Sequence, residues 1–446
     1  MTARETIFAL SSAPGRAGVA VLRVSGPQAG PCLDALAGGR GAPRVAALRT
    51  IRDGAGEAID RGLTLWFPGP ASFTGEDLAE LQVHGGRAVV AALGDALAAQ
   101  PGVRPAEAGE FTRRAFDAGK LDLTEVEGLA DLIDAETRVQ ARQALRQLDG
   151  VVGRRVEDWR DRLLRALAHL EAAIDFADEE LPDDLGARVR TEIAALAGEI
   201  EAALADDHRG ERLRDGLSVA ILGAPNAGKS SLLNAIAQRD AAIVAETAGT
   251  TRDVVEVHLD LAGYPMTLAD TAGLRDLPDD AAGHDAIEAE GVRRARAHAD
   301  RADLRLAVFD ATQPPDPATR ALVDATTLVV WNKIDLRDDF DAAGPDSGFR
   351  LSAKTGEGVP ALLDELERRA VALIGDAAEA PAITRARHRS ALNETAEALR
   401  RADSAEAPEL AAEDLRLATR ALGRITGRVD VEDLLDVIFR DFCIGK

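Results

Sequence analysis

The sequence predicts a multidomain fold of α/β and α+β type, in which an α/β domain is inserted into an α-helical one. Three observations predict it. Apolar segments separated by Gly/Pro turns fill roughly the first hundred residues. Apolar residues then recur at helical spacing from about Thr124 to Ala205, and again after Pro381. Between these helical stretches, strands and helices alternate, which is typical of an α/β domain.

We expect an N-terminal α+β domain at 1–118, a helical domain in two parts at 119–212 and 374–446, and the inserted α/β domain at 213–373. Insertion is favoured because the two ends of a domain often lie close together. In the N-terminal domain a helix is expected at Ala88–Leu97. The strands expected there are Thr6–Leu10, Gly18–Val24, Gly62–Phe67 and Leu78–Val83.

Composition limits the classes of function. A net charge of −23 argues against non-specific nucleic-acid binding by the whole molecule. An arginine-rich segment at 138–165 is more simply a solvated helix face paired with acidic residues. No apolar run is long enough for a membrane span and no secretory signal is seen, so a cytoplasmic protein is expected. The cysteines Cys32 and Cys443 fit a reducing compartment.

The segment Gly223–Ser230 fits the phosphate-binding pattern G-x-x-x-x-G-K-[ST]. It follows an apolar strand at Leu217–Leu222 and precedes a helical stretch at Ser231–Ile236, which is the context that the pattern requires. Its glycines let several N–H groups point at one anion. Lys229 supplies a point charge for the β and γ phosphates, and the Ser230 hydroxyl can ligate Mg²⁺.

Further motifs in order predict that the nucleotide contains guanine. Thr251 offers a second Mg²⁺ ligand, and Asp270–Gly273 offers a carboxylate near the metal and a flexible N–H for the γ-phosphate. Asp335, in Asn332–Asp335, can accept hydrogen bonds from N1–H and the 2-amino group of guanine. Adenine has no donor at those positions, so in a buried site the Asp335 carboxylate would be left without a hydrogen bond. The predicted GTP contacts are Asn226, Ala227, Gly228, Lys229, Ser230, Ser231, Ala245, Glu246, Thr247, Ala248, Gly249, Thr250, Thr251, Asp270, Thr271, Ala272, Gly273, Asn332, Lys333, Asp335, Ser352, Ala353 and Lys354.

With Asn226, the motif Gly249–Asp253 and the terminal Cys443–Lys446, the chain resembles the MnmE (TrmE) family of tRNA-modification GTPases over its full length. The segments Ser72–Asp77, Gly109–Phe116 and Gly119–Thr124 look like further signatures of that family. The resemblance implies a Ras-like G domain and an N-terminal domain that binds a tetrahydrofolate derivative, of 5-formyl or methylene type, and forms a homodimer. It also implies an FAD-dependent MnmG-like partner in a heterotetramer, which adds a carboxymethylaminomethyl group to C5 of the wobble uridine of certain tRNAs.

The same resemblance implies K⁺-dependent hydrolysis. The side-chain oxygen of Asn226 would hold K⁺, with the backbone oxygens of Ala245 and Thr247 and with Thr250 nearby. Glu288 would orient the attacking water, and Glu290 is the alternative because residues between Leu274 and Ile287 are additional to the family pattern.

At the C-terminus, the resemblance implies that Cys443 acts where folate and uridine meet. Without the resemblance, Cys443 would be interpreted as a small buried hydrophobe. The resemblance also implies four folate-binding residues, each of which, without the resemblance, would be interpreted as an ordinary surface charge. They are Arg23, Glu80, Lys120 and Lys446.

Two other functions remain compatible with a G domain. One is a ribosome-assembly or regulatory GTPase that binds RNA and catalyses no modification. The other is a folate-dependent one-carbon transferase in which the G domain is only regulatory.

Overall fold

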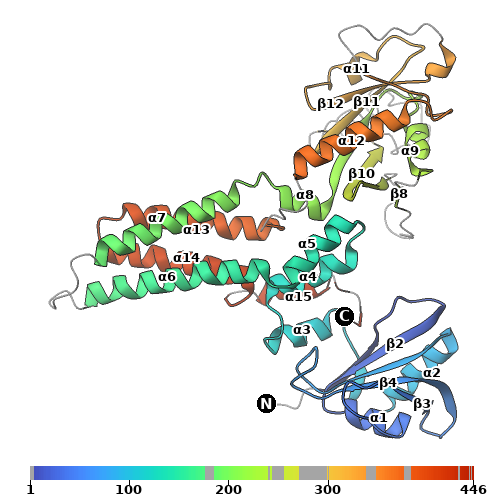
Figure 1. Cartoon of the computed structure of the whole chain (residues 1–446), viewed down its shortest axis with the longest axis vertical. Coiled ribbons are helices and arrows are strands. Elements are labelled where there is room, and N and C mark those ends of the chain that lie inside the picture. The colour runs from blue at the N-terminus through green and yellow to red at the C-terminus, as the bar shows by residue number, and fades with distance from the viewer. Residues whose placement is uncertain are drawn as a thin grey trace, which may run out of the picture. The chain divides into compact units, whose positions relative to one another are not determined.

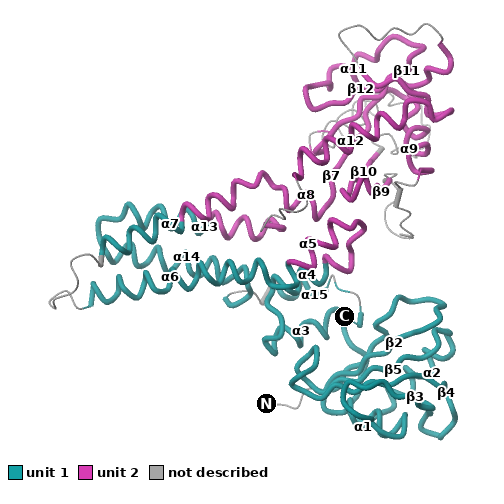
Figure 2. The backbone as a smooth tube through the Cα atoms, viewed as in Figure 1, with its two compact units in different colours: residues 1–130, 147–196, 394–446 teal, residues 131–146, 197–393 magenta. Residues whose placement is uncertain are grey.

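The computed structural model describes residues 5–175, 185–239, 242–243, 256–270, 299, 301–337, 348–375, 383–429, 432–440, 442 and 444–445. The chain divides into two compact units, which Figure 2 shows in two colours. Unit 1 contains Met1–Ala130, Gln147–Leu196 and Glu394–Lys446, and unit 2 contains Asp131–Arg146 and Ala197–Asn393. Each unit joins segments that are distant in sequence, as the insertion of one domain into another requires.

Unit 1 contains a six-stranded sheet in the order β3-β4-β5-β2-β1-β6, with two helices (Figure 1). β6 runs parallel to β1, and the other neighbouring strands are antiparallel. The elements are β1 (Thr6–Leu10), β2 (Ala17–Ser25), α1 (Ala29–Ala37), β3 (Ala47–Arg52), β4 (Ala58–Phe67), β5 (Leu78–Gly85), α2 (Arg87–Ala98) and β6 (Val103–Pro105). Every strand and helix predicted here is present; β3, β6 and α1 were not predicted.

One face of this sheet packs against α1 and α2 in a single apolar core. The other face carries two rows of side chains in register. Leu48, Leu63, Gln82 and Val21 form one row, and Leu65, Glu80 and Arg23 form the next. Leu48 is 57% exposed and Leu63 is 38% exposed. Neighbouring exposed leucines on a sheet are a feature of surfaces that bind other molecules.

Helices follow the N-terminal sheet, as the sequence predicts. They are α3 (Glu110–Asp117), α4 (Leu123–Asp134), α5 (Arg138–Leu148), α6 (Val151–Asp175), α7 (Leu185–Leu204), α13 (Ala386–Ser404), α14 (Pro408–Thr426) and α15 (Glu432–Arg440). In unit 1, α6 packs along α14. Two arginines of α6 pair with acidic residues, as the sequence predicts: Arg162 with Glu192 at 2.6 Å and Arg160 with Glu157 at 3.7 Å.

The C-terminal end of the chain returns to the N-terminal sheet within unit 1. Gly109, at the start of α3, approaches the backbone of α15 so closely that a Cβ would lie 2.4 Å from the carbonyl oxygen of Phe439. Ile444 pairs with Ala108, and the Ser11 hydroxyl donates to the carbonyl oxygen of Gly445 at 3.0 Å. Ile444 and Gly445 of the terminal motif therefore lie beside the end of β1.

Unit 2 contains a seven-stranded sheet in the order β13-β12-β11-β7-β10-β9-β8. β9 is antiparallel to both of its neighbours, β8 and β10, and the other neighbouring strands run parallel. The strands are β7 (Leu217–Leu222), β8 (Ala242–Ile243), β9 (Glu256–Leu261), β10 (Tyr264–Asp270), β11 (Leu304–Asp310), β12 (Thr327–Asn332) and β13 (Phe349–Arg350). The helices are α8 (Arg209–Asp215), α9 (Lys229–Ala237), α11 (Pro317–Arg320), the 3₁₀ turn η1 (Ile334–Leu336) and α12 (Val359–Ile374). The predicted fold class is confirmed.

Unit 2 also includes most of α5, which the sequence placed in the helical domain. Val139 belongs to the core of the unit 2 sheet, and a Cβ on Gly263 would lie 2.8 Å from the Val139 side chain. Glu136 contacts His258 of β9 at 3.1 Å. Helical periodicity could not reveal this packing, because it shows which face is apolar but not what covers it.

Among the described helices, none combines the length and apolar character of a membrane span.

Candidate functional site

The candidate site lies at the edge of the unit 2 sheet where the central strand β7 ends. β7 has β10 on one side and β11 on the other, and all three are parallel. Open parallel sheets bind ligands at the carboxyl ends of their strands, where connections leave toward opposite sides. Gly223, Asp270 and Asn332 lie at the ends of β7, β10 and β12 and each begins a predicted motif, so the fold brings the starts of three motifs to one edge.

The loop after β7 has the backbone that a phosphate cradle needs. Asn226 and Gly228 have φ values of 68° and 94°. A Cβ on Gly223 would lie 2.5 Å from the carbonyl oxygen of Val308, so a larger residue would not fit. Helix α9 begins at Lys229, directly after Gly228. The unsatisfied N–H groups of its first turn therefore adjoin the loop and favour an anion there.

Lys229 lies within this loop. Its side chain is buried, and its ammonium donates to the carbonyl oxygens of Gly223 at 2.8 Å and Ala224 at 3.1 Å. A positive charge is thus held where the β and γ phosphates bind in such loops. Ser230 and Ser231 follow in the first helical turn and are exposed. A hydroxyl in that position fits Mg²⁺, which prefers oxygen ligands.

Asn332 ties the phosphate loop to the two loops predicted to bind the base. Its side chain is 2% exposed, and its Nδ2 donates to the carbonyl oxygen of Ala227 at 3.0 Å. Its Oδ1 accepts from the backbone N–H groups of Lys333 at 2.8 Å and Ala353 at 2.9 Å. A Cβ on Gly228 would lie 2.2 Å from Nδ2. The three loops are therefore one assembly.

Asp335 is oriented by a buried hydroxyl. Ser352 is fully buried, and its Oγ donates to Oδ1 of Asp335 at 2.6 Å. Asp335 itself is exposed, because it lies in the single turn η1 at the sheet edge. Lys354, two residues after Ser352, is exposed as well.

Several predicted contacts lie outside the described residues. They are Ala245, Glu246, Thr247, Ala248, Gly249, Thr250, Thr251, Thr271, Ala272, Gly273, Glu288, Cys443 and Lys446. Asp270 is the last residue of β10 and lies opposite Ile221 in register, which brings its backbone to the same edge as the phosphate loop.

In unit 1, two folate candidates are paired with each other. Arg23 and Glu80 are opposite one another on β2 and β5, and their side chains form an ion pair at 3.0 Å. The Arg23 guanidinium also lies over the Phe73 ring, 5.5 Å from its centroid. Lys120 is exposed. It lies beside the same loop, because a Cβ on Gly75 would be 3.5 Å from Cε of Lys120. The loop 72–77 thus adjoins both Arg23 and Lys120.

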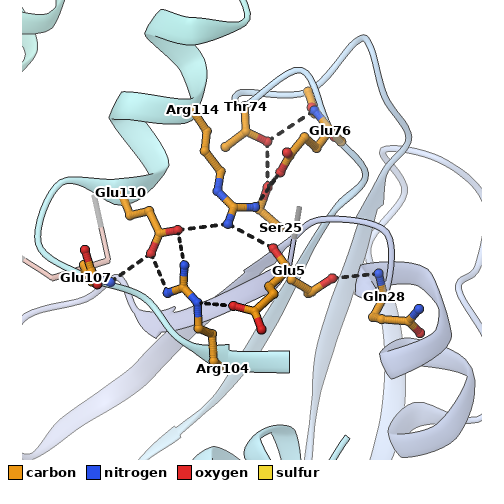
Figure 3. A network of polar contacts seen from close by, with 11 residues as sticks. Glu5, Ser25, Gln28, Thr74, Glu76, Arg104, Glu107, Glu110 and Arg114 are labelled. Carbon is orange, nitrogen blue, oxygen red and sulfur yellow. Dashed lines mark hydrogen bonds and ion pairs between the residues drawn. The ribbon is translucent and has the colours of Figure 1, made fainter. Parts of the chain in front are cut away.

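A buried polar network holds that loop, and Figure 3 shows it. Arg114 of α3 is 5% exposed and contacts Glu76 and Glu110, each at 2.9 Å. Glu110 also contacts Arg104 at 2.7 Å, and Ser25 donates to Glu76 at 3.1 Å. Sequence reasoning singled out both segments that contain these residues but gave the charged side chains no role. A signal was available, since one segment carries Glu76 and the other carries Glu110 and Arg114, each within a few residues of a phenylalanine.

The environment of Glu110 keeps its carboxylate charged. Burial alone would raise its pKa, but hydrogen bonds from Arg104, the Glu107 backbone and Arg114 outweigh burial and lower the pKa to about 2. The network is thus a set of compensated charges that fixes α3 against the sheet.

Comparison with known proteins covers nearly the whole chain. The profile of the MnmE helical domain matches residues 123–443, and that of the GTP-binding protein TrmE N-terminus matches residues 6–120. A "tRNA modification GTPase MnmE" from Parvibaculum lavamentivorans is 59% identical over 99% of this chain and 100% of its own length. Proteins of the same name from Paramagnetospirillum magneticum and Rhodospirillum rubrum are 58% and 56% identical, over 99% of this chain and 100% and 99% of their own lengths.

Proposed function

This chain belongs to the MnmE (TrmE) family, and we propose that it hydrolyses GTP at the edge of the unit 2 sheet to drive a tRNA modification. One observation supports the nucleotide site above all others. The Asn332 side chain joins the phosphate loop to both loops predicted to bind guanine. A nucleotide across this edge would meet the Lys229 ammonium at its phosphates and the Asp335 carboxylate at its base.

The residues of the phosphate loop divide the work of hydrolysis. Backbone N–H groups and Lys229 bind the β and γ phosphates, and Ser230, with Thr251 from outside this loop, would hold Mg²⁺. We expect the Asp270 carboxylate to act near the metal and the N–H of Gly273 to contact the γ-phosphate. Mg²⁺ supplies charge neutralisation between the β and γ phosphates when bound.

The residues at the base edge select guanine. Ser352 holds one oxygen of Asp335, and that oxygen keeps a second lone pair for the base. N1–H and the 2-amino group of guanine both donate to this carboxylate, whereas adenine offers no donor at those positions.

We further propose that K⁺ assists hydrolysis, held by Asn226 with Ala245, Thr247 and Thr250. Asn226 is exposed with a φ of 68°, so this residue lies at the surface of the loop. An amide oxygen suits a hard cation. Glu288, or alternatively Glu290, would orient the attacking water.

GTP hydrolysis in K⁺ and in Na⁺ at equal ionic strength tests this proposal. We expect a higher rate in K⁺, and loss of the difference in Asn226→Ala. Equal rates in both salts would reject the potassium site while leaving the GTP site intact.

For the modification itself, we propose addition of a carboxymethylaminomethyl group to C5 of the wobble uridine, in the cytoplasm, with an FAD-dependent MnmG-like partner. A tetrahydrofolate derivative would bind unit 1 through Arg23, Glu80, Lys120 and Lys446, near Cys443. The attachment of Ile444 and Gly445 beside β1 supports this grouping, because it brings the terminal motif to the domain that carries the other candidates.

We also propose that the protein is a homodimer formed through unit 1. The outward face of the N-terminal sheet supports it, since Leu48 and Leu63 lie side by side on neighbouring strands and both are exposed. A second copy of the sheet would remove these apolar side chains from water.

Mass spectrometry of tRNA nucleosides tests the proposed product. A strain without this gene should lack the C5 modification of the wobble uridine, and the intact gene should restore it. Unchanged modification in the deletion strain would exclude this role and favour a GTPase without modification chemistry.

A further inference from the structure

The end of β11 places a carboxylate beside the predicted guanine site. Asp310, its last residue, is opposite Asn332 in the register of β11 and β12. Its Oδ2 contacts the Lys333 ammonium at 2.6 Å, and both side chains are largely shielded, with 17% and 31% exposed. Asp310 belongs to none of the predicted motifs.

The Asp310 carboxylate is itself fixed. Its Oδ1 accepts from the backbone N–H of Thr312 at 2.9 Å and from the Thr312 hydroxyl at 2.7 Å. These two bonds leave Oδ2 directed at Lys333. Burial raises the pKa of Asp310, but hydrogen bonds from Lys333 and Thr312 outweigh burial, so the pKa lies below its ordinary value. The carboxylate is therefore charged at neutral pH.

Lys333 is held at both ends. Its backbone has a φ of 68°, a conformation that is rare for a residue with a side chain, and its N–H donates to Oδ1 of Asn332 at 2.8 Å. Its stem passes the phosphate loop, since a Cβ on Gly228 would lie 3.9 Å from Lys333 Cε. The ammonium then ends on Asp310. The methylenes therefore lie between two fixed points.

We propose that Asp310 is a positioning residue for the nucleotide site, which holds the Lys333 stem as a preformed apolar floor for the guanine ring. This inference rests on the GTP site proposed above. A free lysine stem must lose its rotamer freedom when a ligand packs on it, and a stem held in advance avoids that cost. The floor contacts the face of the base, whereas Asp335 contacts its edge.

The same two strands offer a matched control at their other end. Asp324 accepts from the backbone N–H and the hydroxyl of Thr326 through Oδ1, at 2.9 and 2.7 Å. Its Oδ2 accepts from Arg305 at 2.8 Å. Oδ1 also accepts from the Thr327 hydroxyl at 2.9 Å. Asp324→Asn thus removes the charge from a similar set of bonds before β12 begins, away from the predicted site.

The test is dissociation of a fluorescent GDP from the full-length chain, with thermal unfolding of the nucleotide-free proteins measured in parallel. We expect about fivefold faster dissociation for Asp310→Asn and no change for Asp324→Asn. Asp310→Asn should add nothing in a Lys333→Met background, because the stem is then no longer held by its charge. Thr312→Val, which loosens the carboxylate without removing charge, should give about a twofold effect in the same direction if Asp310→Asn fails to fold.

Inosine diphosphate lacks the 2-amino group of guanine. It therefore distinguishes a loss of contact with the face of the base from a loss of contact with its edge. Asp310→Asn should weaken GDP and inosine diphosphate by the same factor, whereas Asp335→Asn should weaken GDP more. Additive effects of Asp310→Asn and Lys333→Met, or equal effects of Asp310→Asn and Asp324→Asn, would overturn the inference alone. Failure of the wild-type chain to bind GDP would overturn the proposed site and the inference with it.

Discussion

The candidate site of unit 2 and the polar network of unit 1 use their polar side chains in opposite ways. In unit 2, Lys229 and Asn332 bond mainly to backbone atoms, which shapes the loops. In unit 1, Arg114 and Arg23 form ion pairs with carboxylates of the same domain. Side chains that shape a loop leave charge and N–H groups for a ligand, whereas side chains that neutralise each other hold elements together. This is why the ligand of unit 2 can be named from its residues and that of unit 1 cannot.

The lysines of the chain sharpen this comparison. Arginine greatly outnumbers lysine in the sequence, and every lysine lies in a predicted binding motif: Lys120, Lys229, Lys333, Lys354 and Lys446. Either residue serves on a solvated surface, but a compact ammonium and a planar guanidinium are not interchangeable at a phosphate or against a base. The lysines Lys120 and Lys446 therefore support a ligand site in unit 1, although the ion pairs there do not identify it.

The largest effect is expected for Arg114→Met. It leaves Glu76 and Glu110 without their buried partner, so local stability should fall by about 3 kcal/mol. Hydrogen exchange of α3 and the loop 72–77 measures this, and GTP hydrolysis by the folded protein should not change. Arg401→Met, which breaks an exposed pair with Asp414, is the control and should cost less than about 1 kcal/mol. Unchanged exchange in Arg114→Met would mean that the network does not hold the loop.

Lys229→Ala comes next, and its effect should be confined to unit 2. Removing the point charge at the β and γ phosphates should slow GTP hydrolysis at least about 100-fold. Steady-state phosphate release measures the rate, and hydrogen exchange of unit 1 should match that of the wild type. A rate within a few-fold of wild type would contradict the role of the loop.

Ser352→Ala tests whether a buried hydroxyl orients the base-binding carboxylate. GDP affinity should fall about tenfold, because the hydrogen bond that fixes Asp335 is lost. Calorimetric titration measures it. Ser218→Ala is the matched control, since Ser218 also donates to a carboxylate, that of Asp303, at 3.1 Å at the start of β7. An equal loss in both variants would indicate a general effect on unit 2 rather than one on the site.

Acid should affect unit 1 through Glu110. Its pKa is lowered to about 2 in the folded chain, against 4.5 for the unperturbed group. Its contribution is therefore present above about pH 4.5 and is lost as the pH falls toward 2. Solvent screening limits the effect to about 1 kcal/mol. Hydrogen exchange of α3 against pH should show this loss, and a Glu110→Gln variant should lack this part of the pH dependence.

The smallest effect on stability is expected for Glu80→Gln. Its ion pair with Arg23 is partly exposed, so its loss should cost less than about 1 kcal/mol. Folate binding, followed by fluorescence, should nevertheless weaken if the pair faces the ligand. Full retention of folate binding would assign the Arg23–Glu80 pair a structural role. The charged pairs of unit 1 would then differ even more from the ligand-binding residues of unit 2.

The sequence predicted strands such as Thr6–Leu10 and Leu217–Leu222 because each is a short apolar run. It missed β3, whose side chains are mostly exposed or half-buried and give little apolar signal. It identified the family, and the comparisons confirm both the family and the GTPase enzyme class. It assigned Asn332 to the site from its motif but could not show that this side chain bonds to Ala227 of the phosphate loop.

By itself, the sequence determined the motifs of the G domain, because their chemistry depends on a glycine, a lysine or a carboxylate at a fixed place in a short loop. Only the tertiary structure decided which charges are compensated and by what. Arg114 with Glu76, Arg23 with Glu80 and Asp310 with Lys333 pair across strands and helices that are far apart in the chain. The physical reason is that such pairs depend on strand register and helix packing, and those are set by the burial of the whole apolar core rather than by neighbours in sequence.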